Sequence, residues 1–275
     1  QSGGTLPRSE EQAPVCGLQN SALLAGGENS GYKTEADMYD GFSWRAVTGV
    51  LTTARANAPL IGSSGASIFC GGQGSSTLDS CEEFDGTSWS AGGTLTDDLT
   101  AGVSEGFGTL TAGVIAGGSL SASVSAVTQL YNGTAWSTGN NCLATKNYAA
   151  CAGKNSAGLV TGGSSPAYST ATEEYDGTSW AAGGTLGTGR SQLTGAGYQN
   201  GALAFAGTTG SNSLVNETYD GTSWSAANSL VGSRRSAGGN GIPTSAFVAG
   251  GYGSGYLSTS EEWTKPGQDV SWNLI

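Results

Sequence analysis

Acids and bases that recur at fixed positions are the residues of this sequence best placed to do chemistry. An acid stands two positions before an aromatic residue at Asp37, Glu82, Glu173, Glu217 and Glu261, and Gln129 takes this place once. A base stands ahead of each acid, at Arg8, Arg55, Lys146, Arg190 and Arg235 (with Arg234 beside it), and Thr100 stands ahead of Gln129. Such groups offer a ring of cations that binds an anion, or carboxylates that act as general acid and base.

A structural role for these charges is the interpretation we favour. The one place that lacks the base also lacks the acid, which indicates that acid and base form a pair, because loss of one partner removes the reason to keep the other. Buried charges usually occur in pairs, and a catalytic device is rarely repeated six times. We therefore predict structural pairs from the bases Arg55, Lys146, Arg190 and Arg235 and the acids Glu82, Glu173, Glu217 and Glu261.

Composition excludes several kinds of chemistry. The 275 residues include no His, so the sequence has no Ser/His/Asp or Cys/His nucleophile and no metal or haem site that needs imidazole. A net charge of −11 argues against nucleic acid as a partner. We expect no metal and no cofactor, since no loop gathers the carboxylates that calcium needs. A glycosidase that uses carboxylates alone is the least favoured function, with Asp97, Asp98 and Glu105 as its candidate acids.

The hydrophobic pattern and the cysteines add two expectations. No apolar run approaches the roughly 18 residues that a membrane-spanning helix needs, so we expect no membrane insertion. The five cysteines are an odd number. Cys70 and Cys81 flank one predicted hairpin loop, where they either form a disulfide or remain buried thiols.

An internal repeat must position all of these groups. An aromatic residue, Asp or Asn, Gly, two variable residues and Trp recur with a period of 44 to 47 residues, ending at Trp44, Trp89, Trp136, Trp180 and Trp224. A degenerate sixth copy runs from Trp263 to Trp272, and an apolar run ending in small residues, mostly Gly-Gly, precedes each copy. Asp-Gly or Asn-Gly between strand-like segments is the strongest short-range signal for a β-hairpin.

Each repeat of about 45 residues therefore predicts four antiparallel strands, the size of one propeller blade. One such sheet exposes both faces, and radial stacking of neighbours buries them. We predict an all-β, six-bladed β-propeller that forms a single domain over residues 1–275, its blades marked by Trp44, Trp89, Trp136, Trp180, Trp224 and Trp272. The Gly-Gly-Thr-Leu segment that follows Trp89 occurs again at residues 3–6, so the ring should close where the two chain ends meet, between blades 6 and 1.

The order Gly-Gly, Glu-x-Tyr-Asp and Trp resembles the kelch repeat over nearly the whole chain. The resemblance implies a kelch-type propeller, in which a similar Arg and Glu are structural. The near-identical Asp-Gly-Thr-Ser-Trp units also resemble kelch-like repeats of phage virions and marine bacterial surface proteins. This resemblance implies a virion or extracellular cell-surface location and a role in protein assembly or host-surface attachment.

The loops between the second and third strands are the predicted binding region. They vary in sequence, lie on the same face as the linkers between blades, and are rich in Ser, Gly and Asn, with aromatic residues at Tyr32, Tyr168, Tyr252 and Tyr256. Tyr among small polar residues suits contacts to a sugar or to another protein, although the same composition also keeps loops soluble. We expect a non-catalytic binding or structural protein whose partner is a protein in a larger assembly or a host-surface glycan. The alternative is a secreted, lectin-like propeller.

Overall fold

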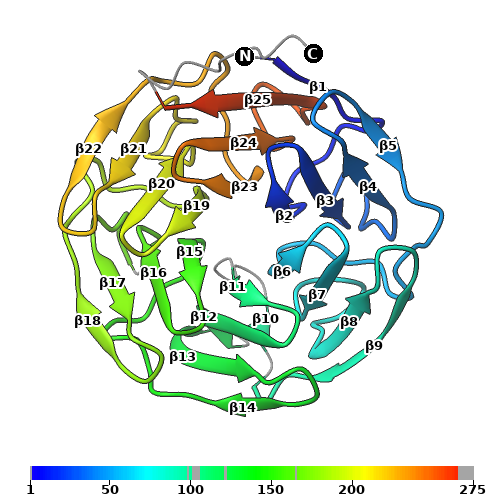
Figure 1. Cartoon of the computed structure of the whole chain (residues 1–275), viewed down its shortest axis with the longest axis horizontal. Helices are drawn as coiled ribbons and strands as arrows, with labels where there is room; N and C mark the ends of the chain where they lie inside the picture. Colours follow the sequence, from blue (N-terminus) through cyan, green and yellow to red (C-terminus); the bar gives the residue numbers. More distant parts are fainter. Residues whose placement is uncertain (1, 98, 101–105, 121–122, 165, 266–275) are drawn as a thin grey trace, which may run out of the picture.

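Strands arranged in six antiparallel sheets make up the fold. The structure is a computed structural model that describes residues 2–97, 99–100, 106–120, 123–164 and 166–265. These residues form 25 strands and no helix. The sheets stand radially around a central axis (Figure 1). The chain is therefore a six-bladed β-propeller, as the repeat predicted.

The first three blades follow one another in chain order, each from the axis outward. Blade 1 contains β2 (Val15–Leu18), β3 (Ser21–Ala25), β4 (Ala36–Tyr39) and β5 (Trp44–Ala46). Blade 2 contains β6 (Leu60–Ser63), β7 (Ala66–Cys70), β8 (Ser80–Phe84) and β9 (Trp89–Thr94). Blade 3 contains β10 (Leu99–Thr100), β11 (Gly106–Thr109), β12 (Ala112–Leu120), β13 (Ser123–Tyr131) and β14 (Trp136–Thr138). In blade 3 both β10 and β11 pair with β12, so its inner strand is in two parts.

The last three blades complete the ring. Blade 4 contains β15 (Ala150–Lys154), β16 (Ala157–Thr161), β17 (Thr172–Tyr175) and β18 (Trp180–Ala182). Blade 5 contains β19 (Thr194–Tyr198), β20 (Gly201–Phe205), β21 (Asn216–Tyr219) and β22 (Trp224–Ala227). Blade 6 contains β23 (Gly238–Ile242), β24 (Ser245–Ala249) and β25 (Thr259–Thr264), and its outer strand is β1 (Ser2–Thr5) from the other end of the chain.

The pairing of β1 with β25 closes the ring. Ser2 lies opposite Glu261 and Thr5 lies opposite Thr259, and β1 runs beside β25 in Figure 1. Residues 3–6 thus lie at the junction of blades 6 and 1, as the sequence predicted. Trp272, the predicted marker of blade 6, lies outside the described residues.

The Asp-Gly turn joins the two outer strands of a blade. Asp85 Oδ1 accepts hydrogen bonds from the backbone N–H groups of Thr87 and Ser88, both at 2.8 Å. Gly86 has a φ of 95°, a conformation that costs Gly little and other residues much more. The turn brings Phe84 and Trp89 together, with ring centroids 4.9 Å apart and ring planes tilted by 37°.

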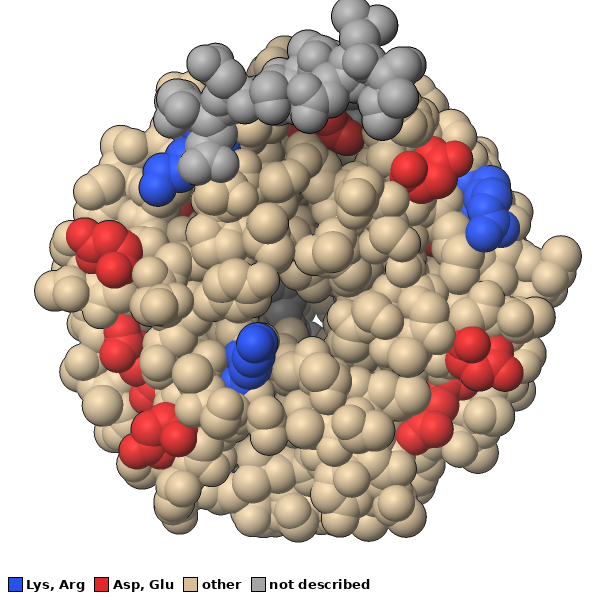
Figure 2. Space-filling model, viewed as in Figure 1, with Lys and Arg blue, Asp and Glu red and all other residues tan. Residues whose placement is uncertain are grey.

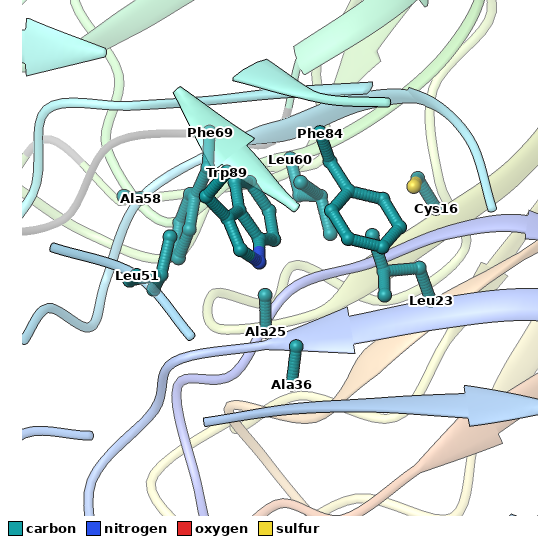
Figure 3. Packing of buried hydrophobic residues seen from close by; sticks show 10 residues of the cluster. All are labelled: Cys16, Leu23, Ala25, Ala36, Leu51, Ala58, Leu60, Phe69, Phe84 and Trp89. Atoms are coloured by element: carbon teal, nitrogen blue, oxygen red, sulfur yellow. The ribbon is translucent and has the colours of Figure 1, made fainter. Parts of the chain in front are cut away.

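Neighbouring blades share a core that these aromatic pairs fill. Trp89 and Phe84 of blade 2 pack against small and aliphatic residues of blade 1, including Leu23, Ala25 and Ala36 (Figure 3). All of these side chains are buried, and burial of apolar surface is the main favourable contribution to folding. Each blade therefore covers a face that its neighbour could not bury alone.

The Gly pair at the end of the second strand, present in five of the six blades, allows a linker to pass close by. Gly26 and Gly27 have φ angles of 65° and 101°. A Cβ atom at Gly26 would lie 2.4 Å from the carbonyl oxygen of Arg55, and one at Gly27 would lie 2.8 Å from Ala13 Cβ. A side chain at either position would crowd this approach, which brings the base of the next repeat against the sheet; blade 5 alone among the blades has Ala206 at the first position, with a φ of 56°.

Candidate functional site

The propeller has two faces with different loops. The face we call the loop face carries the loops between second and third strands and the linkers between blades. The face we call the hairpin face carries the turns between first and second strands and the Asp-Gly turns. Figure 2 shows the hairpin face, which has acidic side chains around its rim and a hollow at its centre.

The repeated bases and acids form ion pairs within blades. Arg55 Nη2 lies 2.9 Å from Glu82 Oε1, Arg190 Nη2 lies 2.9 Å from Glu217 Oε1, and Lys146 Nζ contacts Glu173 Oε1. The Arg also donates to backbone carbonyls, as Arg55 Nη1 does to Ser80 at 2.6 Å. Because these pairs are buried and each base contacts its own acid, they are not available to an anionic ligand.

The pair in blade 6 differs from the prediction. Arg234, and not Arg235, contacts Glu261, with Nη2 to Oε1 at 2.6 Å. Arg234 Nη1 also donates to the carbonyl oxygens of Gly250 and Thr259, at 3.0 and 2.9 Å. The separation of base and acid explains the correction, because Arg234 precedes Glu261 by the same 27 residues that separate Arg55 from Glu82.

Blade 1 departs from the pattern in a different way. Glu10 precedes Asp37 by 27 residues and thus stands where the other blades have a base. Arg8 reaches Asp37 instead, with Nη2 to Oδ2 at 2.5 Å, while its Nε lies 4.0 Å from Glu10 Oε2. Glu10 is fully buried, and neither carboxylate oxygen has a hydrogen-bond partner among the described residues. Burial raises the pKa of Glu10 to about 8, while Arg8 lowers it and Asp37, Glu35 and Lys33 contribute less.

Blade 3 replaces the ion pair with neutral groups. Gln129 Oε1 accepts from the Thr96 backbone N–H at 2.7 Å, and Gln129 Nε2 donates to the Asp97 carbonyl at 3.2 Å. The amide therefore connects strand β13 to the preceding linker, as the carboxylates do in other blades. Asp97 also accepts from Thr96 Oγ1 at 3.4 Å, and the other candidate acids, Asp98 and Glu105, lie outside the described residues.

A second set of acids joins neighbouring blades. Tyr39 of blade 1 donates its hydroxyl to Glu262 of blade 6 at 2.7 Å, and Tyr219 of blade 5 donates to Glu174 of blade 4 at 2.6 Å. Burial, followed by the bond to the carboxylate, raises the pKa of both tyrosines. These carboxylates therefore also have structural partners.

The four predicted binding tyrosines lie on the loop face but do not form one site. Tyr32, Tyr168 and Tyr256 occupy the same position of a short turn in blades 1, 4 and 6, where each bridges back to the residue four positions earlier. The same turn occurs in blades 2 and 5, so these loops share a backbone despite their different sequences. Only Tyr252 and Tyr256 meet, edge to face, with ring centroids 5.7 Å apart.

Arg235 extends this tyrosine pair into a polar and aromatic cluster at the junction of blades 5 and 6. The Arg235 guanidinium lies over the ring of Tyr252, 4.7 Å from its centroid. Arg235 Nη1 donates to Asn212 Oδ1 at 3.0 Å, and Asn212 Nδ2 donates to the Gly253 carbonyl at 2.8 Å. A cation, an amide and two aromatic rings held in one place can contact a sugar or a protein side chain.

The two faces also differ in what they expose. Large exposed apolar or aromatic side chains on the loop face are Val50, Leu143, Tyr168, Leu214, Val231 and Tyr256. Val231 is 91% exposed, and it adjoins Leu214, since the Leu230 backbone N–H bonds the Leu214 carbonyl. Among the described residues, the hairpin face exposes three such side chains, Leu18, Phe42 and Tyr198. It also carries the exposed carboxylates Asp40, Asp85, Asp176 and Asp220, whose pKa values are lowered by hydrogen bonds from the backbone of their own turns. The loop face therefore has more exposed apolar side chains and lacks these four turn carboxylates.

A ring of polar residues that sequence reasoning missed surrounds the axis on the loop face. Gln12, Asn57, Tyr148, Gln192 and Ser236 all have φ between 51° and 57°. Backbone hydrogen bonds connect neighbours in this ring, such as Gln12 N–H to the Ser236 carbonyl at 2.8 Å. Each residue stands five positions before a Gly of the first strand, which is the sequence signal that could have found them.

These residues line a cavity at the loop-face end of the axis. The cavity at the loop face measures about 70 Å³, and Gln12 Oε1 and Ser236 Oγ are buried beside it with no partner among the described atoms. Two more cavities lie along the axis, one of about 20 Å³ beside Val15 and Gly195 and one of about 230 Å³ at the hairpin face, beside Lys154 and Tyr198.

The remaining sequence predictions concern the cysteines and a possible metal site. Cys70 and Cys81 lie directly opposite each other on β7 and β8 and form a disulfide. Cys16, Cys142 and Cys151 are buried and not disulfide-bonded. Within the part of the chain that the structure describes, no group of three His, Cys, Asp or Glu side chains is arranged to hold a metal ion.

Comparison with known proteins identifies no family, so the fold defines the class of this protein. A scan of the sequence against protein-family models finds no match, and a search of curated proteins finds none. No helix among the described residues is long and apolar enough to cross a membrane. The architecture and the paired charges define the class as a six-bladed β-propeller with a structural ion pair in most of its blades.

Proposed function

We propose that this protein is a non-catalytic binding or structural propeller whose loop face contacts a protein partner in a larger assembly. The observation that carries the proposal is the set of exposed apolar side chains on that face, above all Val231, which is 91% exposed and adjoins the exposed Leu214. Leu143, which is 60% exposed, lies on the same face in the linker before blade 4. Apolar side chains that adjoin one another on a surface mark interaction sites. The acids of the repeats support a non-catalytic role, since they are bound to Arg, Lys, Tyr or backbone groups.

The resemblance to kelch repeats supports a more specific form of this proposal. Kelch-like units of this kind occur in phage virions and marine bacterial surface proteins, so we propose a virion or cell-surface component that mediates assembly or host-surface attachment. The exposed Asp-Gly turns give the hairpin face a negative charge, which disfavours stacking of that face on a second copy. The loop face is then the contact surface.

A glycan-binding propeller is the second candidate, and one cluster favours it. Tyr252, Tyr256, Arg235 and Asn212 place two aromatic rings beside a guanidinium and an amide. Aromatic rings stack on the apolar faces of sugars, and the polar groups bond sugar hydroxyls. This cluster also lies on the loop face, so the two candidates differ in ligand and not in surface.

Two measurements separate these candidates. Quantitative mass spectrometry of particles or surface assemblies isolated from the source would give the copy number of the chain, and a glycan array would test sugar binding. Incorporation at a fixed copy number without saturable sugar binding supports the assembly role. Saturable binding to one glycan class that is lost in Tyr252→Ala, with no incorporation, contradicts it and supports the lectin.

A further inference from the structure

One position of the repeat carries a different side chain in every blade. It is the last residue of the first strand, and it pairs with the first residue of the second strand, as Leu18 pairs with Ser21. The residue directly before it is Gly in all six blades, with φ between 100° and 140°, so the backbone is the same throughout the ring. In chain order the six side chains are those of Leu18, Ser63, Thr109, Lys154, Tyr198 and Ile242. Side chains that vary on a rigid scaffold are where proteins often place their binding residues.

These six residues surround the axial cavity at the hairpin face. All six line the cavity of about 230 Å³, together with the Gly that precedes each of them. The first strands are the innermost strands of their sheets, so each has one edge that faces the axis (Figure 1). Most ligand pockets measure roughly 300 to 1,000 Å³, so this cavity suits a small molecule.

The order of the blades divides this ring into an apolar half and a polar half. Tyr198 and Leu18, which are 41% and 48% exposed, flank Ile242 in the consecutive blades 5, 6 and 1. The consecutive blades 2, 3 and 4 contribute the polar side chains of Ser63, Thr109 and Lys154. Exposed apolar side chains that are rimmed by polar ones mark ligand-binding grooves. The arrangement therefore favours a ligand with one apolar and one polar end.

Lys154 carries the charge at this cavity. The described residues that line the cavity include no acid and no other base. The Lys154 side chain is exposed, and its Nζ lies 5.8 Å from the centroid of the Tyr198 ring, where the two halves meet. Figure 2 shows a basic side chain beside the central hollow, whereas the acidic side chains lie toward the rim. In a chain of net charge −11, a cation at the axis with no acid beside it in the cavity indicates an anionic ligand group.

The number of charges limits which anion fits. A phosphate group carries a charge of about −1.5 to −2 near neutral pH, whereas a carboxylate carries one negative charge. One ammonium group therefore balances a carboxylate and leaves a phosphate partly unpaired. An inorganic anion would also make no use of Tyr198, Ile242 and Leu18.

We propose that the axial cavity at the hairpin face binds a small amphipathic carboxylate. Its carboxylate pairs with Lys154 Nζ, and its apolar part lies against the ring of Tyr198 and the side chains of Ile242 and Leu18. This site is on the face opposite the proposed contact surface, so failure of either proposal leaves the other unaffected.

Binding of phenylacetate, measured by calorimetry or ligand-observed NMR, tests the proposal. Phenylacetate has both parts of the ligand, whereas acetate lacks the ring and 2-phenylethanol lacks the carboxylate. Phenylacetate should bind saturably with a Kd of about 1 mM or tighter, as a small ligand with one ion pair does. Acetate and 2-phenylethanol should each bind at least about tenfold more weakly.

Variants of the two central residues locate the binding. Lys154→Gln should bind phenylacetate no more tightly than the native sequence binds 2-phenylethanol. Tyr198→Ala should also weaken phenylacetate binding, because it removes the ring that the ligand contacts. Lys265→Gln is the matched control, since Lys265 is exposed and does not line the cavity, and it should bind like the native sequence. Thermal melts first establish that each variant is folded.

Three results would overturn the proposal. One is no saturable binding of phenylacetate up to about 10 mM. The second is unchanged affinity in Lys154→Gln or in Tyr198→Ala, and the third is 2-phenylethanol binding as tightly as phenylacetate. If a variant does not fold, the amide NMR signals of the native chain locate the ligand. Shifts at Gly153 and Gly197, which line the cavity, support the site, and shifts confined to the loop face contradict it.

Discussion

Arg190 Nη2 lies 2.9 Å from Glu217 Oε1 in the interior of blade 5. Arg190 Nη1 donates to the carbonyl oxygens of Ala206 and Val215, and Glu217 Oε2 accepts from the Gly187 backbone N–H at 2.6 Å. One ion pair thus connects the linker between two blades to the second and third strands of the next blade.

Replacement of Arg190 by Ala should destabilise the protein by about 3 to 5 kcal/mol, since it leaves Glu217 as a buried and unpaired charge. Arg45→Ala is the control, because Arg45 is exposed and surface changes usually remain within about 0.5 kcal/mol. Denaturant unfolding measures both. An Arg190→Ala protein as stable as Arg45→Ala would exclude a stabilising role for the pair.

Arg234 and Arg235 should respond differently to the same change. Arg234→Ala should destabilise the protein by an amount similar to Arg190→Ala, because Arg234 is buried against Glu261. Arg235→Ala should lower stability by less than about 1 kcal/mol, since its contacts to Tyr252 and Asn212 are partly exposed. Thermal melts of the two variants provide the measurement. A larger loss of stability in Arg235→Ala than in Arg234→Ala would indicate that Arg235 is the partner of Glu261.

The internal repeat was enough to predict the ring of blades. The side-chain contacts between repeats could not be predicted from it. The period and the Asp-Gly turns predicted six blades, because each signal is local to one unit. The choice between Arg234 and Arg235 failed, although the 27-residue separation of Arg55 from Glu82 would have resolved it. The same spacing would have placed Glu10 in the position of a base.

The spacing to a first-strand Gly marks the axial-ring residues in the sequence, but the contacts among them and the grouping of the tyrosines could not be predicted from one repeat. The positive φ of Gln12 and Gln192 accompanies backbone hydrogen bonds between neighbouring blades, and residues far apart in sequence make these bonds. Tyr252 meets Tyr256 because both belong to one turn, whereas Tyr32 and Tyr168 lie on other blades. The composition of the loops indicated which face of the propeller binds. Which side chains meet on that face is determined by the geometry of the ring.

Stability should fall as pH rises between about 4.5 and 8. Burial raises the pKa of Glu10 from 4.5 to about 8, so over this window the folded state keeps a proton that the unfolded state has lost. The effect is of the order of a few kcal/mol, because one pKa unit corresponds to about 1.4 kcal/mol. Glu10→Gln stays neutral and should remove the fall, which makes the variant more stable than the native sequence at pH 8.5. Urea unfolding at pH 4.5, 6.5 and 8.5 tests this, and parallel pH profiles would contradict it.

The disulfide between Cys70 and Cys81 should be detectable in the purified protein. Alkylation after unfolding without a reductant should modify three cysteines, Cys16, Cys142 and Cys151, and a reductant should expose two more. Reduction should destabilise the fold by up to roughly 3 kcal/mol, the loop-closure effect for a short loop. Mass spectrometry counts the alkyl groups, and five additions without reductant would show two free thiols.

The central claim, that the loop face is the contact surface, is tested most directly by surface variants in the native assembly. Val231→Asp with Leu143→Asp changes exposed residues on the loop face, and Phe42→Asp, 88% exposed on the hairpin face, is the matched control. Quantitative mass spectrometry measures how much of each variant is incorporated, after thermal melts establish that each is folded. The account predicts at least a tenfold loss for the loop-face variant and native incorporation for Phe42→Asp. Equal incorporation of both, or loss of Phe42→Asp alone, would contradict it.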